Sequence, residues 1–398
     1  MVRKQAKTEN DIFIELAATT QGVVLEKEES VKYLVDTGNL ALNYICSGKF
    51  IDGGIAGGKI TEIFGSESSS KSLIGANILH GCQKLGGYAI MLDCENAINR
   101  DFVQTASHLD LKRILIYNPP TLERAFRKIH NVVKAIRTKD KESPITVVYD
   151  SITVSPCERE FREADLPDEF SAADFKRVVG ANEQPGERAK VCSKELRKLS
   201  PMLAKENVTL IVINQTRNKI GVMFGSPTTP GGGGEALKFY ASCRLETHAA
   251  KKIVRKIENV KDHDVSMGVN ININNKKNRA FKPFRGTKGV QLFFDKGMNP
   301  LSGLLTPLLD EDRIHVVSGG NFAVNEMYLP DGKEEYKFKS SVERNDIPAK
   351  VLLECPKLIN ATSTEEVAEY LSVFDSAIAQ SQAEDIQENE ISNSDDEA

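Results

Sequence analysis

The chain is predicted to be an α/β protein with a mostly parallel central sheet covered by helices on both faces. Three observations predict this class. Short segments of strand length alternate with segments of helical periodicity from residue 59 onward. The strand segments are apolar throughout, as strands buried on both faces are. Acidic and glycine-containing segments follow several of them, at the edge where parallel sheets bind ligands.

The expected strands and helices follow one another in a regular order. Strands are predicted at residues 59–64, 88–92, 114–117, 145–149 and 209–213. Helices are predicted between them at residues 73–85, 122–135 and 187–206. Because parallel strands need a long crossover, usually a helix, this alternation indicates a parallel sheet.

Length and composition exclude several other classes. The 398 residues are 40% hydrophobic and 27% charged, which is ordinary globular composition. No apolar run approaches the roughly 20 residues of a membrane span, and the N-terminus has no signal-peptide core, so we expect a soluble cytoplasmic protein without membrane contact. The seven cysteines are widely spaced without a C-x-x-C pair, so we expect reduced, mostly buried thiols.

Changes in composition divide the chain into four expected parts. A small N-terminal appendage precedes the sheet-bearing core, a small α/β unit follows it, and an acidic tail closes the chain and is expected to be disordered. Their expected bounds are residues 1–34, 35–304, 305–374 and 375–398. Polar stretches at residues 157–186 and 216–235 interrupt the core and are expected to form long loops.

The charge of −4 is unevenly distributed. Residues 361–398 contain eleven Asp and Glu and no Lys or Arg, which leaves 52 basic against 45 acidic residues in the rest of the chain. Residues 251–288 alone carry eleven Lys and Arg against three acids. A basic body with an acidic tail is typical of a protein that binds a polyanion and whose own acidic tail competes with that polyanion. A solvated basic face with a solubility tail is the alternative.

A candidate phosphate-binding loop lies between the first core strand and the helix after it. Successive backbone N–H groups and the helix N-terminus would hold phosphates, Lys71 would reach the β and γ oxygens, and the Ser72 hydroxyl would ligate Mg²⁺. Ser70 stands where the pattern has glycine, and its Cβ is expected to narrow the loop. A serine-rich helix cap is the alternative. The loop comprises Gly65, Ser66, Glu67, Ser68, Ser69, Ser70, Lys71 and Ser72.

Acidic residues at two further strand ends support a nucleotide site. Asp150 ends an apolar strand, where such an acid orients Mg²⁺ through its water shell. Asp93 and Glu95 end another, and a carboxylate there can accept a proton from an attacking water. Each acid alone is more often a strand-end cap. Three such ends in one α/β chain predict nucleotide binding.

The segment after the last predicted strand resembles a known family. Residues 213–227, the glycines at 231–234 and residues 236–242 closely resemble the second DNA-binding loop of bacterial RecA recombinases. The phosphate loop, the acids and residues 277–284 fall in the same order as in RecA. The resemblance covers roughly residues 35–305 and implies a RecA-like ATPase core. The substituted phosphate loop and the flanks look like those of phage RecA and UvsX relatives.

The resemblance implies roles for matching residues at the nucleotide. Lys71 and Ser72 would hold phosphates and Mg²⁺, and Asp150 would support the metal through water. Glu95 would activate water. Phe102 would stack on adenine, and Gln215 would sense the γ-phosphate and release the DNA loop after hydrolysis.

The resemblance also implies assembly and DNA contacts. Lys277 and Arg279 would act in trans on the ATP of a neighbouring protomer, and residues 1–34 would serve oligomerisation. Two basic residues, an apolar wedge and two glycines would contact DNA without reading its sequence: Arg217, Lys219, Ile220, Gly233 and Gly234.

The function expected from the resemblance is that of a DNA-dependent ATPase. It would form a helical filament on single-stranded DNA and exchange strands with duplex DNA, aided by single-strand-binding and loader proteins. The acidic tail would restrain duplex capture. An ATP-binding recombination mediator with little or no hydrolysis is the alternative, supported by Ser70. A hexameric helicase or motor on the same core is a further alternative, which leaves residues 213–242 unexplained.

Overall fold

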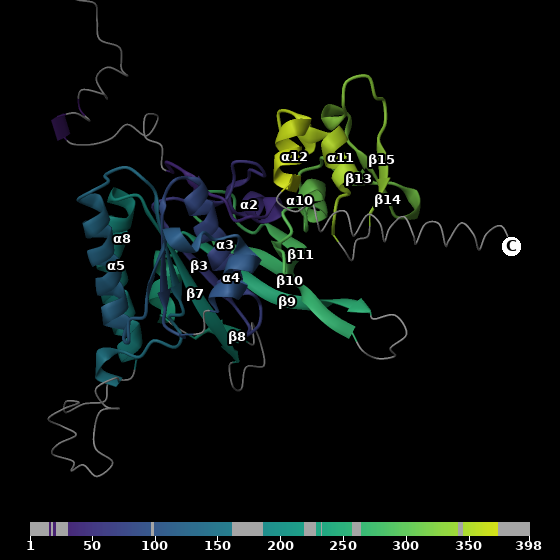
Figure 1. The fold of residues 1–398 in the computed structure, drawn as a ribbon. Helices are drawn as coiled ribbons and strands as arrows, with labels where there is room; N and C mark the ends of the chain where they lie inside the picture. Colours follow the sequence, from purple (N-terminus) through teal and green to yellow (C-terminus); the bar gives the residue numbers. More distant parts are fainter. Residues whose placement is uncertain are drawn as a thin grey trace, which may run out of the picture.

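The computed structural model describes residues 16, 19–20, 31–96, 99–160, 186–218, 228–231, 233–256, 264–340 and 345–372. These residues form a ten-stranded sheet with helices against it and two small sheets beside it (Figure 1). Six neighbouring strands run parallel: β5 (Ile114–Tyr117), β4 (Tyr88–Asp93), β6 (Ile145–Asp150), β7 (Val208–Asn218), β3 (Ile60–Gly65) and β9 (Cys243–Lys256). The predicted mostly parallel α/β fold is therefore confirmed.

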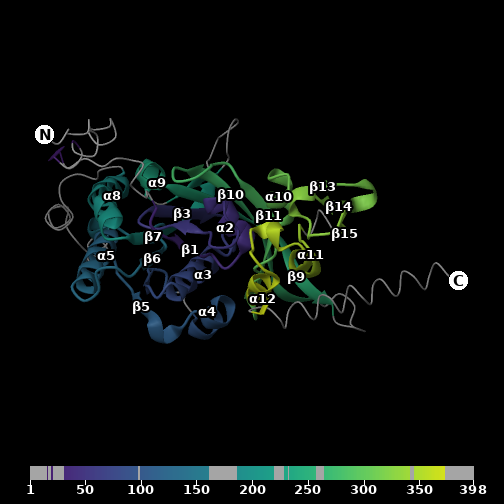
Figure 2. The ribbon, with the colours of Figure 1, turned by 90° about the horizontal axis from the view of Figure 1, so that it is seen from above.

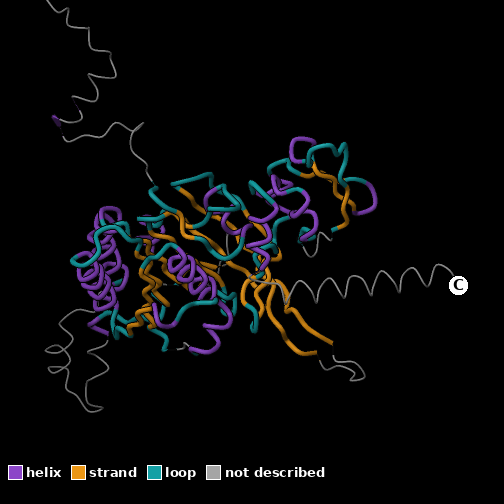
Figure 3. Tube along the Cα trace, turned by 45° about the horizontal axis from the view of Figure 1, so that its top comes forward, coloured by secondary structure: helices purple, strands orange, loops and turns teal. Residues whose placement is uncertain are grey.

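Four further strands of this sheet are antiparallel. β10 (Asp264–Asn278), β11 (Gly286–Phe293) and β12 (Gly297–Met298) continue the sheet beyond β9. β8 (Thr228–Pro230) pairs with the end of β7. The outer parts of β9 and β10 pair only with each other, because β11 pairs with β10 no further out than Gly268, and they project as a two-stranded ribbon (Figure 3).

Helices cover both faces of the parallel strands. Neighbouring residues such as Val147 and Val148 belong to different buried clusters, because successive strand side chains point to opposite faces. α3 (Lys71–Lys84) contributes Ile74 to one cluster, and α4 (Arg100–Ser107) packs beside it. α5 (Leu122–Arg137) and α8 (Glu187–Lys205) fill the other cluster, as the view from above shows (Figure 2).

The predicted strands and helices are confirmed, with ends displaced by one or two residues in most cases. β7 is the larger difference: it ends at Asn218 rather than at residue 213, because pairing with β8 extends it. Residues 243–298 had no predicted element, yet they form the long strands β9 and β10. These strands carry Lys and Asn among their apolar residues, so their hydrophobic signal is weak.

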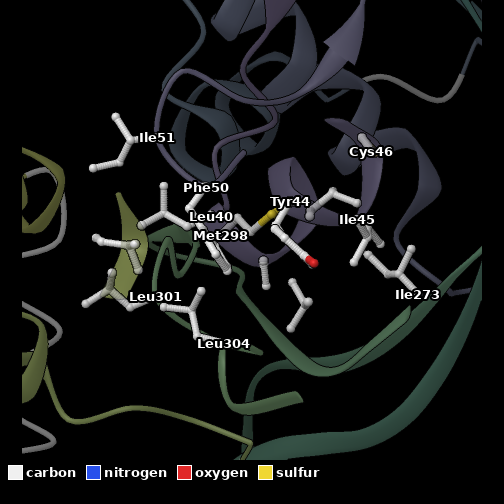
Figure 4. Close-up of a cluster of buried hydrophobic side chains, with 14 of the residues drawn as sticks. Leu40, Tyr44, Ile45, Cys46, Phe50, Ile51, Ile273, Met298, Leu301 and Leu304 are labelled. Carbon is white, nitrogen blue, oxygen red and sulfur yellow. The ribbon is translucent and has the colours of Figure 1, made fainter. Parts of the chain in front are cut away.

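The C-terminal elements follow the sheet without a break in the buried core. They are α10 (Leu305–Asp310), β13 (Ile314–Val316), β14 (Asn321–Val324), β15 (Lys337–Lys339), α11 (Ala349–Glu354) and α12 (Thr364–Ser372). β1 (Leu34–Val35), β2 (Ile55–Ala56) and α2 (Leu40–Ser47) precede β3. Figure 4 shows Leu40 and Tyr44 of α2 beside Met298 and Leu304. One hydrophobic cluster thus crosses the boundary expected near residue 304. The tail at residues 375–398 lies outside the described residues.

Two expectations from composition can be compared with the described residues. All seven cysteines are free thiols, and six of them are buried while Cys94 is partly buried, as expected. Within the described ranges, no helix combines the length and apolar character of a membrane span.

Candidate active site

The candidate site lies at the carboxyl edge of the parallel strands. Gly65 at the end of β3 is the register partner of Gln215 on β7. Asp93 at the end of β4 is the register partner of Asp150 at the end of β6. The prediction that these strand ends share one edge is therefore confirmed.

The phosphate loop turns directly from β3 into α3. Ser70 precedes the helix in the left-handed conformation (φ 56°, ψ 26°) and makes no side-chain cap hydrogen bond. The first amides of α3 therefore have no side-chain cap at Ser70 and suit an anion. Gly65 is required where it stands, because a Cβ there would lie 2.1 Å from the Thr247 carbonyl oxygen of β9.

Lys71 is held inside this loop. It is only 7% exposed, and its Nζ donates to the Ser66 carbonyl at 2.6 Å and to Ser69 Oγ at 3.3 Å. Burial lowers the pKa of Lys71, while the carboxylates of Asp150 and Glu95 act in the opposite direction. The loop geometry and this ammonium group fit a phosphate ligand.

Ser72 and Asp150 form the candidate Mg²⁺ site. Burial raises the pKa of Asp150 to about 6; the hydrogen bond with Ser72 lowers it, and Glu95 and Asp93 raise it further. A nearby cation stabilises the charged form of a carboxylate in this environment, and hydroxyl and carboxylate oxygens are suitable ligands for Mg²⁺. Among the described residues no three or more His, Cys, Asp and Glu side chains form a metal cluster. Ser72, phosphate oxygens and water bound to Asp150 would therefore hold the ion.

Glu95 and Gln215 are in direct contact. Glu95 Oε1 accepts a hydrogen bond from Ser151 Oγ at 2.6 Å and one from Gln215 Nε2 at 3.3 Å. The Gln215 backbone N–H donates to Thr153 Oγ1 at 3.0 Å. Ser151 and Thr153 were not predicted. Both are polar residues directly after the β6 strand, which is the signal that could have identified them.

The stem of the DNA loop begins at Gln215. The carbonyl of Gln215 accepts a hydrogen bond from the Gly231 N–H at 2.7 Å, and Arg217 lies on β7 opposite β8. Gly233 and Gly234 have φ values of 74° and 56° at the start of α9 (Gly234–Tyr240). Lys219 and Ile220 fall outside the described residues, as does the side chain of Phe102 on α4.

Lys277 and Arg279 lie beside α9. Lys277 Nζ donates to the backbone carbonyls of Lys238 at 2.5 Å and Phe239 at 3.1 Å. The Arg279 guanidinium lies 5.4 Å from the centre of the Phe239 ring. Phe239 itself is 64% exposed, so these groups stand at the surface beside α9.

Known proteins are similar to this chain in sequence over most of its length. The family described as RecA N-terminal domain matches residues 20–299. The chain belongs to the RecA family. It is 31% identical to Protein RecA of Thermus aquaticus over 87% of this chain and 93% of that protein. It is 30% identical to Protein RecA of Rhodopirellula baltica over 87% and 86%, respectively.

Membership in the RecA family confirms the resemblance drawn from residues 213–242. Protein RecA of Ureaplasma parvum, 31% identical over 78% of this chain and 82% of its own, is a further relative. The chain is therefore a RecA-type recombinase, and its sheet is that of the RecA core.

Proposed function

We propose that the protein is an ATPase activated by single-stranded DNA, on which it polymerises to catalyse homologous pairing and strand exchange in recombination and repair. The hydrogen bond between Glu95 and Gln215 carries this proposal. It joins the candidate base for hydrolysis to the residue from which the DNA loop departs. A protein that only bound ATP would have no need to couple these two groups.

Each residue of the site has a defined task in this proposal. Bound ATP and Mg²⁺ supply the phosphoanhydride bond and neutralise its charge. Lys71 and the N-terminus of α3 bind the phosphates, and Ser72 and Asp150 hold the ion. The two hydrogen bonds that Glu95 accepts from the described residues Ser151 and Gln215 engage Oε1, and Oε2 would accept a proton from water.

Gln215 would transmit the state of the nucleotide to DNA. Its side-chain amide reaches Glu95, while its backbone carbonyl holds Gly231 at the far side of the loop stem. A change at the γ-phosphate would therefore reach both strands of the stem. Arg217, Lys219, Ile220, Gly233 and Gly234 would contact the DNA backbone, which leaves the bases open for pairing.

Assembly would place ATP between protomers. Lys277 and Arg279 would reach the nucleotide of a neighbour from the surface beside α9, and residues 1–34 would support oligomerisation. Phe102 would stack on adenine. The proposal places the protein in the cytoplasm, with single-strand-binding and loader proteins as partners and the acidic tail as a restraint on duplex DNA.

ATP hydrolysis measured with and without single-stranded DNA tests the proposal. Strong stimulation by DNA is expected in the unmodified protein, and Glu95→Gln should abolish turnover while ATP and DNA still bind. Strand exchange would then be assayed with the same two proteins. Binding of both ligands without turnover in the unmodified protein would overturn the ATPase proposal.

The mediator alternative rests on Ser70. In the structure Ser70 adopts the left-handed conformation that glycine adopts readily. A Lys71→Ala variant separates the two proposals, with Lys128→Ala on α5 as a surface control. If the protein is an ATPase, Lys71→Ala should abolish ATP turnover. If it is a mediator, the substitution should leave ATP turnover unchanged.

A further inference from the structure

A row of charged side chains crosses the sheet beside the nucleotide edge. Glu62 on β3 is the register partner of Arg244 on β9, and Arg244 is the register partner of Lys277 on β10. Register partners on neighbouring strands project to the same face of a sheet. One carboxylate and two cations therefore lie side by side on three adjacent strands.

Glu62 is the buried end of this row. Its side chain is fully buried, and Oε1 accepts a hydrogen bond from Asn214 Nδ2 at 2.8 Å. Its Oε2 accepts a hydrogen bond from Arg244 Nε, and the guanidinium of Arg244 lies 4.5 Å from the centre of the Phe64 ring. A buried carboxylate must be paired, so the positions of Asn214 and Arg244 depend on Glu62.

The row continues toward the nucleotide through β7. Asn214 Oδ1 accepts a hydrogen bond from the Thr153 hydroxyl at 2.9 Å, and the same hydroxyl oxygen accepts the N–H of Gln215 at 3.0 Å. Glu62 is thereby connected to the backbone of the candidate γ-phosphate sensor.

Lys277 lies at the other end of the row, where neighbouring charges influence its protonation. Arg279, Arg244 and Glu62 face its ammonium group, and α9 contributes backbone carbonyls while Lys238 pairs its own side chain with Glu235. Burial, and then the two guanidinium groups, lower the pKa of Lys277 to about 8. Glu62 raises that pKa, so its carboxylate favours the charged form.

We propose that Glu62 is a positioning residue that holds Arg244 in place and keeps Lys277 charged for its action on the ATP of a neighbouring protomer. The inference rests on the proposed function, because it takes the action of Lys277 in trans from there. It adds a buried residue of β3 that precedes the phosphate loop.

Two measurements on the full-length protein test the inference in Glu62→Gln. Competitive acetylation of Lys277 against pH, read by mass spectrometry, gives its titration midpoint without any need for turnover. The midpoint should be about 8 in the unmodified protein and lower in the variant, because the carboxylate that favours the charged form of Lys277 is removed. ATP turnover with single-stranded DNA should fall as the pH rises. In the variant this fall should occur at a lower pH than in the unmodified protein.

Glu246→Gln is the matched control. Glu246 lies two residues after Arg244 on β9, and its carboxylate pairs with Lys276 at 2.9 Å rather than with Lys277. This variant should leave the Lys277 midpoint unchanged. Glu62→Asp is the second test variant, because it retains the charge that keeps the core folded; it should give a smaller shift in the same direction.

The outcomes separate the inference from the function on which it rests. An unchanged Lys277 midpoint in both Glu62 variants would overturn the inference. A lower midpoint with an unchanged pH profile of turnover would support the effect of Glu62 on Lys277 and overturn the role of Lys277 in trans. A lower Lys277 midpoint together with a shifted pH profile of turnover supports the whole proposal.

Discussion

Ser70 adopts a backbone conformation that is unfavourable for a residue with a side chain. Its φ of 56° lies in the left-handed region, where residues with a Cβ are disfavoured by about 1 kcal/mol or more. Lys71 and α3 follow without a break, so this strain is offset by the rest of the loop. The altered motif therefore changes the stability of the loop and not its course.

Ser70→Gly should raise the free energy of unfolding by up to about 1 kcal/mol, since relief of the strain exceeds the added entropy of unfolded glycine. ATP turnover should be retained or increased, because the cradle for phosphate keeps its shape. Urea unfolding and steady-state hydrolysis measure both effects. Ser66→Gly, in the same loop at a residue outside the left-handed region, is the control for flexibility alone. A loss of turnover confined to Ser70→Gly would contradict this account.

Asp150 makes the stability of the nucleotide-free protein depend on pH. Its pKa is raised from 3.8 to about 6 by burial, so between these values the folded state binds more protons than the unfolded state. The free energy of unfolding therefore decreases as pH rises from about 4 to 6.

Asp150→Asn should remove this penalty and stabilise the nucleotide-free protein at pH 7.5 by about 1 to 3 kcal/mol, with little gain below pH 4. The same variant should lose the stabilisation that Mg²⁺ and ATP provide. Thermal unfolding at pH 4 and pH 7.5, with and without Mg²⁺ and ATP, measures both effects. An equal gain at the two pH values would point to a packing effect instead.

At the scale of elements, β9 connects the phosphate loop with the basic ribbon. The Thr247 hydroxyl of β9 lies 2.9 Å from Ser69 Oγ, and Ser69 in turn accepts a hydrogen bond from Lys71 Nζ. Residues 251–255 of the same strand carry exposed basic side chains beyond the sheet edge. The strand that carries the ribbon therefore also contacts the residue that supports Lys71.

Thr247→Val should raise the KM for ATP several-fold and cost about 1 kcal/mol of stability, because the loop loses a buried hydrogen bond. Thr247→Ser keeps the hydroxyl and should restore the KM. Steady-state kinetics over a range of ATP concentrations measures the difference. Equal KM values for the Val and Ser variants would show that the hydroxyl has no part in holding the loop.

At the scale of the whole molecule, one edge of the large sheet is open. β5 is the last strand on that side, and its Leu115 and Ile116 are 44% and 38% exposed. An edge strand with apolar residues favours pairing with another chain. We expect a neighbouring protomer to cover this edge in the filament.

Leu115→Asp should therefore weaken filament formation strongly while the protein stays folded. Light scattering and electron microscopy with single-stranded DNA and ATP measure assembly. Val316→Asp, at a position 64% exposed on the separate small sheet, is the control and should assemble normally. Normal filaments from Leu115→Asp would exclude β5 from the interface.

The proposed effect of the acidic tail on DNA binding depends on the charge of the whole molecule. Deletion of residues 375–398 should strengthen binding to duplex DNA, because a competitor for the basic surface is removed. The affinity should be compared at two salt concentrations. Unchanged duplex affinity would remove the tail as a restraint.

The sequence by itself determined the elements with strong local signals. Five of the six parallel strands, the helices α3, α5 and α8 and the phosphate loop were predictable, because apolar runs, helical periodicity and the loop pattern are local in the chain. The meeting of Asp93, Asp150 and Gln215 at one edge also followed, since parallel strands end on the same side.

Only the tertiary structure decided what depends on contacts between distant segments. β9 and β10 have mixed polar and apolar residues, and their pairing across the sheet makes them strands. In the sequence, Glu62 is a polar residue in a mostly apolar strand segment. Its proposed role depends on its hydrogen bond with Arg244, which is 182 residues away in the chain. A buried charge acquires its role from the partners that the fold brings to it, and no local pattern records them.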